Sequence, residues 1–293
     1  MAVFVSHLFL LLQRVLPKHL ITALVYRLAR IRQPALKDFM IRSFSNFYKV
    51  NLDDVDKTVP DDFACFNDFF TRELKSGSRP VDTSVSSIVS PADGFVSAVG
   101  VVEKNAVYQA KGHDYSLEDL LATDLDDART YLDGSFATIY LAPFNYHRVH
   151  APLAGELVAA RFVPGTLFSV NQTTVANLRG LFTRNERLIC HFKSPAGLYV
   201  LIFVGALNVG SITTPWSGEL RPRKGNIVDN IDLHACREPR TVDKGGLLGW
   251  FNMGSTVIVL LPPGHCEWRS GLQSGDALRM GEAIGRVLND DMP

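Results

Sequence analysis

The sequence predicts an α+β fold, in which N-terminal amphipathic helices precede a mainly β domain. Three observations predict it. Apolar residues recur at helical spacing through the first 50 residues, short β-branched runs follow from about residue 87, and glycine and proline separate those runs. With 46% apolar and 20% charged residues, the chain has the composition of an ordinary globular protein. We expect a division into a helical segment, residues 1–50, and a β-rich domain, residues 51–293.

The first 50 residues predict two or three amphipathic helices. Apolar residues lie on one face over residues 3–16, continue beyond Pro17, and recur over residues 36–47. No stretch holds 18 uninterrupted apolar residues, which argues against a transmembrane span. A secretory signal fits poorly, because Gln13 and Arg14 close a short apolar core without a small-residue cleavage site.

The same segment is strongly basic. It holds eight Lys/Arg residues and one acidic residue, Asp38, a net charge of +7 in a chain that is neutral as a whole. Basic amphipathic helices are typical of anionic membrane surfaces, and the apolar content favours a membrane over a nucleic acid. We expect peripheral binding to the cytoplasmic side of the cell membrane, with the mitochondrial inner membrane as the alternative. Ordinary core helices and a mitochondrial transit peptide are the other interpretations.

Six runs in the later part of the chain predict strands. They are residues 95–102, 136–141, 157–163, 187–192, 198–204 and 256–261. A Pro-x-x-Gly-x-apolar element begins at Pro91, Pro152 and Pro215 and predicts a recurring turn into a strand. The last two copies and the tail, residues 271–281, are similar to the barrel-like turns of biotinyl/lipoyl-type domains. A carrier domain would need an exposed lysine at a hairpin tip, and none is present, so this likeness concerns the fold alone.

Residues 254–256, Gly-Ser-Thr, join a flexible glycine to a predicted rigid strand. Gly254 tolerates unusual backbone angles, and the apolar run over residues 257–261 predicts a buried strand. A serine held between the two, Ser255, can attack the carbonyl that precedes it. Taken alone, such a tripeptide would more often simply open a strand.

A serine hydroxyl needs a neighbouring base, and that base needs an acid to orient it. His150 and Asp93 are the candidates. Their ordinary interpretations are a structural or surface histidine and an aspartate that forms a turn within Pro-Ala-Asp-Gly. His147 lies three residues before His150, so on an extended strand the two side chains point to opposite faces. We therefore assign the two histidines separate roles.

No metal site is expected. The four cysteines are scattered without a C-x-x-C pair, and the two histidines have no third ligand at a suggestive spacing. This cysteine usage is typical of reduced thiols in a reducing compartment.

These residues belong to a set of short motifs that runs in one order along nearly the whole chain. The motifs are Phe66-Asn-Asp-Phe-Phe-Thr-Arg72, Ser90-Pro-Ala-Asp-Gly94, Gln109-Ala-Lys-Gly-His113, Tyr146-His-Arg-Val-His150, Pro164-Gly-Thr-Leu-Phe-Ser-Val-Asn171, Asn185-Glu-Arg187, Val209-Gly-Ser-Ile212 and Gly254-Ser-Thr256. Together they resemble the phosphatidylserine decarboxylase family, whose members process themselves and carry a pyruvoyl group. Met253 stands where that family usually has leucine, and Leu247 where it often has an acid. Neither departure touches a reacting atom.

The resemblance implies two stages of chemistry. In the first, Ser255, deprotonated by His150 with Asp93 behind it, attacks the Gly254 carbonyl, and the chain is cleaved into residues 1–254 and 255–293. Ser255 then becomes a pyruvoyl group, a covalent cofactor that serves as the electron sink for decarboxylation. In the second stage, phosphatidylserine loses carbon dioxide to give phosphatidylethanolamine. His147 is expected to position the substrate or to protonate the product. The two cleaved chains stay associated, and a homodimer is common in such a family.

Two other functions use the same features. A membrane-associated Ser-His-Asp hydrolase would employ the same side chains without self-cleavage, but the Gly-x-Ser-x-Gly elbow typical of many such enzymes is missing. A lipoyl-like binding module attached to membrane through its N-terminal segment would need no chemistry at all. Of the three functions, only the self-processing decarboxylase predicts two chains.

Overall fold

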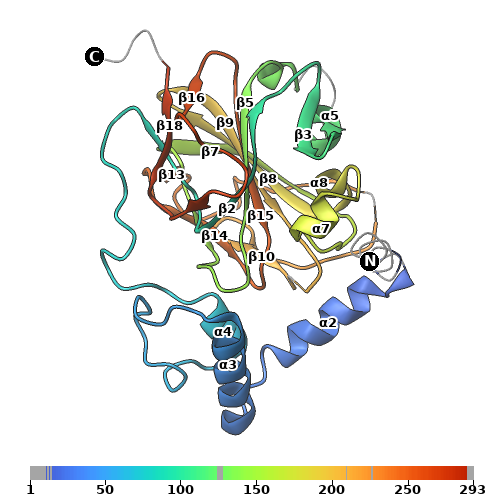
Figure 1. The fold of residues 1–293 in the computed structure, drawn as a ribbon, viewed down its shortest axis with the longest axis vertical. Helices are drawn as coiled ribbons and strands as arrows, with labels where there is room; N and C mark the ends of the chain where they lie inside the picture. The colour runs from blue at the N-terminus through green and yellow to red at the C-terminus, as the bar shows by residue number, and fades with distance from the viewer. Residues whose placement is uncertain are drawn as a thin grey trace.

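The computed structural model describes residues 11, 13, 15–123, 128–208, 210–225 and 227–288. Helices α2 (Lys18–Leu28), α3 (Pro34–Tyr48) and α4 (Phe66–Phe70) lie at one end of a larger body of strands (Figure 1). The α+β class and the order of helices before sheets are confirmed. Most of the helix expected over residues 3–16 lies outside the described residues.

Proline and capping residues set the bounds of the two long helices. Pro17 is the N-cap of α2, and Pro34 occupies the first turn of α3, where a missing N–H costs nothing. The Gln33 side chain accepts a hydrogen bond from the Leu36 N–H at 2.7 Å. Helix α3 ends at Tyr48, and its C-cap residue, Lys49, adopts a left-handed conformation with φ of 55°.

One large sheet forms the centre of the β domain. Its strand order is β12-β7-β8-β9-β15-β5-β2-β17, and β13 also pairs with β7. The strands are β2 (Gly94–Val101), β5 (Ser135–Tyr140), β7 (Gly155–Val163), β8 (Arg187–Ser194), β9 (Gly197–Val204), β12 (Asp229–Asn230), β13 (Thr241–Val242), β15 (Thr256–Leu261) and β17 (Ala277–Leu278). All six predicted strands are confirmed to within two residues. The path is open at both ends, so the described strands form no closed barrel.

The remaining strands form three small sheets. A three-stranded sheet contains β1 (Ser87–Val89), β18 (Ala283–Val287) and β16 (Cys266–Trp268). A four-stranded sheet contains β11 (Gly218–Leu220), β10 (Ile212–Thr214), β14 (Leu247–Phe251) and β6 (Arg148–His150). Strands β3 (Ala106–Ala110) and β4 (His113–Ser116) form a hairpin. Short helices complete the described fold: α5 (Leu117–Leu121), η1 (Arg129–Tyr131), α7 (Gln172–Val175) and α8 (Leu181–Arg184).

Two hydrophobic clusters hold these elements together. The larger fills the β domain, and every residue of β15 is buried in or against it. The smaller joins the helices to the segment that follows them; its buried members are Ala29, Ile41, Val50, Val55, Phe63, Phe66, Phe69 and Phe70. Met253 packs against this smaller cluster, so the helices reach the residues just before β15. The division at residue 50 stays a prediction, and the smaller cluster spans it.

Candidate active site

Ser255 lies immediately before the central strand β15. Its side chain is fully buried, and its Oγ has no hydrogen-bond partner among the described residues. The ladder between β15 and β5 continues by one residue, because the Leu141 N–H donates to the Ser255 carbonyl oxygen at 2.8 Å. A buried, unpaired hydroxyl costs free energy and is uncommon in native proteins. Ser255 is thus a fixed and desolvated nucleophile candidate.

His147 lies against Gly254. A Cβ atom placed on Gly254 would be 3.1 Å from His147 Cε1, a tight contact that would require the imidazole to shift slightly. The imidazole stacks on Phe70 with ring centroids 4.1 Å apart. His147 Nε2 lies 3.3 Å from the Pro143 carbonyl oxygen, which assigns the proton to Nε2 and leaves the Nδ1 lone pair free.

Burial keeps the His147 imidazole neutral. Desolvation, followed by the charge of the nearby Arg72, lowers the pKa of His147 to about 3. Such a group accepts a hydrogen bond at neutral pH but is a weak Brønsted base. The geometry therefore suits His147 to hold a donor beside Gly254.

His150, the last residue of β6, is oriented by contacts with Tyr146 and with the loop before β14. Its Nδ1 donates to the Gly245 carbonyl oxygen at 2.8 Å, and the Tyr146 hydroxyl lies 3.0 Å from its Nε2. Burial is the main cause that lowers the pKa of His150, while the Gly245 bond and the negative charge of Asp93 act in the opposite direction. The two histidines share no hydrogen-bond partner in the described structure, and their separate roles stay a prediction.

Asp93 forms an ion pair with Arg79, a residue for which the sequence predicted no role. Its carboxylate accepts bonds from Arg79 Nε at 2.8 Å and from Arg79 Nη2 at 2.6 Å, and a third from the Met280 N–H at 2.9 Å. The turn that carries Asp93 is tied to β6, because the His150 N–H donates to the Pro91 carbonyl oxygen at 2.7 Å. Within the described residues no hydrogen bond joins Asp93 to His150 or His150 to Ser255. The link between Asp93 and His150 in this structure is the negative charge of Asp93, which favours a higher pKa of His150.

The Arg79–Asp93 pair gives a stability prediction. Replacing Arg79 with Met leaves a nearly buried carboxylate without its partner, so we expect the free energy of unfolding to fall by about 3–5 kcal/mol. Urea unfolding of chains that also carry Ser255→Ala, which keeps the chain in one piece, measures this. Arg286→Met is the matched control, because its pair with Glu267 is exposed and its loss should cost about 1 kcal/mol or less. Equal losses in the two variants would contradict the prediction.

The sequence predicted no role for several further residues at this site. Arg72 is nearly buried, and its Nη2 donates to the carbonyl oxygens of Phe144 and Asn145 at 3.1 and 3.2 Å, which fixes the loop before His147. Burial lowers the pKa of Arg72 to about 10. Arg72 and Tyr146 lie inside the quoted motifs, so the motifs were the available signal. Arg79 lies outside them, and only the fold reveals its contact.

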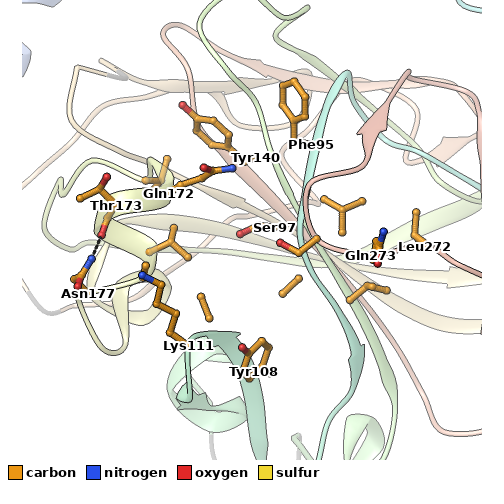
Figure 2. A pocket seen from close by; sticks show the side chains of 18 residues that line it. Phe95, Ser97, Tyr108, Lys111, Tyr140, Gln172, Thr173, Asn177, Leu272 and Gln273 are labelled. Carbon is orange, nitrogen blue, oxygen red and sulfur yellow. Dashed lines mark hydrogen bonds between the residues drawn. The ribbon is translucent and has the colours of Figure 1, made fainter. Parts of the chain in front are cut away.

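A separate cleft lies beside β2. Figure 2 shows its lining by β2, the β3–β4 hairpin and α7, with Lys111, Tyr108 and Thr173 among the labelled side chains. Its volume is ≈ 740 Å³. None of the four candidate residues lines this cleft in the described part of the chain. Tyr140 connects it to the site, because Tyr140 precedes Leu141 and pairs with Thr256.

The fold thus places Ser255, the candidate nucleophile, directly before the buried central strand β15, with His147 against the preceding glycine. The family described as "Phosphatidylserine decarboxylase" matches residues 66–286, and one described as "PSD" matches residues 8–49. A protein of Methylococcus capsulatus is 44% identical over 285 residues, which cover 97% of this chain and 98% of that protein. A relative from Hahella chejuensis is 40% identical, and the match covers 97% of this chain and 95% of that protein. A relative from Azotobacter vinelandii is 44% identical, and the match covers 96% of this chain and 99% of that protein. All three are named phosphatidylserine decarboxylase proenzyme. The chain belongs to the phosphatidylserine decarboxylase family.

Proposed function

We propose that this chain is a self-processing, pyruvoyl-dependent decarboxylase that converts phosphatidylserine to phosphatidylethanolamine and carbon dioxide. The observation that carries the proposal is the buried, unpartnered Ser255 hydroxyl directly after Gly254, in a chain of this family. The word proenzyme in the names of the relatives supports a maturation step.

Cleavage between Gly254 and Ser255 would give chains of residues 1–254 and 255–293. Strand β15 pairs with β9 on one side and β5 on the other, over five and six residue pairs. Its side chains are all buried. These contacts support continued association of the short chain after cleavage, because separating it would expose a complete central strand.

The pKa values favour a division of labour between the histidines. A base at neutral pH works best when its pKa is close to that pH. The pKa of His147, about 3, lies far below neutral pH. Burial also lowers the pKa of His150, but the charge of Asp93 and the bond to Gly245 partly offset that effect. We assign His150, supported by Asp93, to the deprotonation of Ser255, and His147 to positioning of the reacting groups.

The residues around Ser255 fit a pyruvoyl group formed in place. Gly254 and Gly205, which follows the end of β9 and lies across from Ser255, present no side chains there, and Ser255 is fully buried. Once formed, the group supplies an electron sink for loss of carbon dioxide. The imidazole of His147 and the buried backbone of β15 would hold it.

The helices present an apolar face suited to a bilayer. The side chains of Leu20, Leu24, Phe39 and Phe47 are exposed on α2 and α3, whose basic residues complement anionic headgroups. An apolar groove between these helices reaches Met253, one residue before Gly254. No helix in the described ranges is long and apolar enough to cross a membrane. We place the protein at the cytoplasmic surface of the cell membrane, with the mitochondrial inner membrane as the alternative, and a homodimer stays a prediction.

Intact-mass measurement of the purified protein tests the proposed function. Two chains are expected, and the smaller, residues 255–293, should begin with a blocked group that has no free amine. Release of carbon dioxide from phosphatidylserine by the same preparation completes the test. A single chain of unchanged mass, or two chains with a free amine on the smaller, would contradict the proposal.

The membrane surface gives a second, independent prediction. Phe39 and Phe47 are 67% and 78% exposed, so changing both to Ser should leave the fold intact while removing apolar area from the bilayer contact. We expect binding to anionic vesicles to fall by about tenfold or more, and the residual binding to weaken as salt rises. Vesicle sedimentation measures both effects. Val85→Ser, at a residue 82% exposed outside the helices, is the matched control and should bind as the parent does.

A further inference from the structure

Glu186 is a buried carboxyl group that the proposed mechanism leaves unused. Its side chain is fully buried, and neither carboxylate oxygen has a hydrogen-bond partner among the described residues. Desolvation raises the pKa of Glu186 to about 8. An unpaired acid in a dry core is costly, so its position calls for a functional explanation.

The sheet places Glu186 in the same row as Ser255. The Gly205 N–H donates to the Glu186 carbonyl oxygen at 2.8 Å, which continues the β8–β9 ladder by one residue. The pairing of Thr256 with Val204, the last residue of β9, makes Gly205 the neighbour of Ser255 just beyond the end of that strand. Residues directly opposite each other in an antiparallel sheet present their side chains on the same face.

Gly205 leaves the space between the two side chains open, and Glu186 fills it. A Cβ atom on Gly205 would lie 2.6 Å from Glu186 Cγ and 2.8 Å from Glu186 Oε1. The carboxyl group therefore folds over Gly205, which is the position next to Ser255. Neighbouring strands are about 4.8 Å apart, so the carboxyl lies one strand spacing from Ser255, on the same face and without a hydrogen bond to its Oγ.

The backbone also fixes the direction of the Ser255 α-hydrogen. The Ser255 carbonyl points to β5, where Leu141 donates to it. In an antiparallel sheet the Cα–H bond of such a residue points to the opposite neighbour, here Gly205, which directly follows β9. The α-hydrogen of Ser255 thus points toward the strand that Glu186 covers.

We propose that Glu186 is the general base that removes the α-hydrogen of Ser255 during maturation. The proposal rests on the self-cleavage proposed above and concerns its second step. After the acyl group of Gly254 has moved from the Ser255 nitrogen to Oγ, ionised Glu186 takes the α-hydrogen as a proton. The electron pair forms the Cα–Cβ double bond, the Cβ–Oγ bond breaks, and Gly254 leaves as a carboxylate. Glu186 ends the step protonated, and residue 255 becomes dehydroalanine.

Glu186→Gln tests this role, because it keeps the shape of the side chain and removes the base. Chains made by cell-free translation are sampled over time for the two products, with and without hydroxylamine. Hydroxylamine cleaves the ester that precedes elimination and releases a small chain with a free amine at Ser255. We expect the amine-blocked chain to form about 10²–10⁴-fold more slowly in the variant, and the hydroxylamine-sensitive ester to accumulate. Glu156→Gln, on the same sheet but paired with Arg240 at its edge, is the matched control and should mature normally.

The pH dependence separates a base from a structural group. Because a base acts only when ionised, elimination from the ester should speed up as the pH rises toward about 8 and then level off. The Glu186→Gln variant should lack this rise, and Glu186→Asp should restore part of it. Maturation of Glu186→Gln at the parental rate, or a stalled variant without hydroxylamine-sensitive ester, would overturn the proposal. If the parent chain itself yields no second chain, the proposed function fails instead.

Discussion

Ser255→Ala is expected to abolish both chain cleavage and decarboxylation. The nucleophile and the atoms of the pyruvoyl group both come from this one side chain, so no other residue can replace it. The variant should fold, because the Ser255 hydroxyl makes no hydrogen bond in the described structure and alanine fills nearly the same space. Gel electrophoresis should show one chain of full length, and labelled phosphatidylserine should release no carbon dioxide above background.

Thr256 provides a matched control for this experiment. Its Oγ1 is likewise buried and without a partner in the described region, and it lies one residue further along. Thr256→Val removes that hydroxyl while keeping the side-chain volume, and should leave cleavage intact. Two-chain product from Ser255→Ala would exclude residue 255 as the cleavage site. Loss of cleavage in Thr256→Val would show that packing at the start of β15 also controls the reaction.

The strands were predictable because their apolar residues form unbroken runs. Strand β15 is buried on both faces between β9 and β5, and its sequence, residues 256–261, is accordingly a continuous β-branched and leucine run. The helices were predictable from apolar spacing and from the interruption at Pro17. The order of the strands was not, since β15 pairs with strands more than 50 and more than 110 residues away in the chain, and no local pattern encodes such partners.

The candidate site was only partly predictable for the same reason. Sequence motifs singled out Ser255 and the two histidines, but the contact of His147 with Gly254 arises where the loop before β6 meets the residues before β15. The ion pair of Arg79 with Asp93 joins residues 14 apart, and Arg79 lies outside every quoted motif. Glu186 was inside a quoted motif, yet its meaning depends on Gly205 and on the register of three strands.

The two histidines should give opposite phenotypes. If His150 is the base for Ser255, His150→Ala should slow chain cleavage by about 10²–10⁴-fold, and Asp93→Ala should slow it in the same direction, because the charge of Asp93 helps to keep His150 basic. His147 is too weak a base at neutral pH, so His147→Ala should still be cleaved, though more slowly, and should convert little phosphatidylserine. Gel analysis of the small chain and release of labelled carbon dioxide, measured on the same preparations, distinguish the two patterns.

The structure also defines the result that would reverse these roles. His147 has its free Nδ1 beside Gly254, whereas both ring nitrogens of His150 already have partners in Gly245 and Tyr146. If placement outweighs basicity, His147→Ala and the bulkier His147→Gln will both stay uncleaved while His150→Ala matures fully. His234→Ala, at an exposed histidine, should leave both reactions unchanged. A cleaved but inactive His147→Gln variant, with an uncleaved His150→Ala, would instead show that the pKa and not the distance selects the base for Ser255.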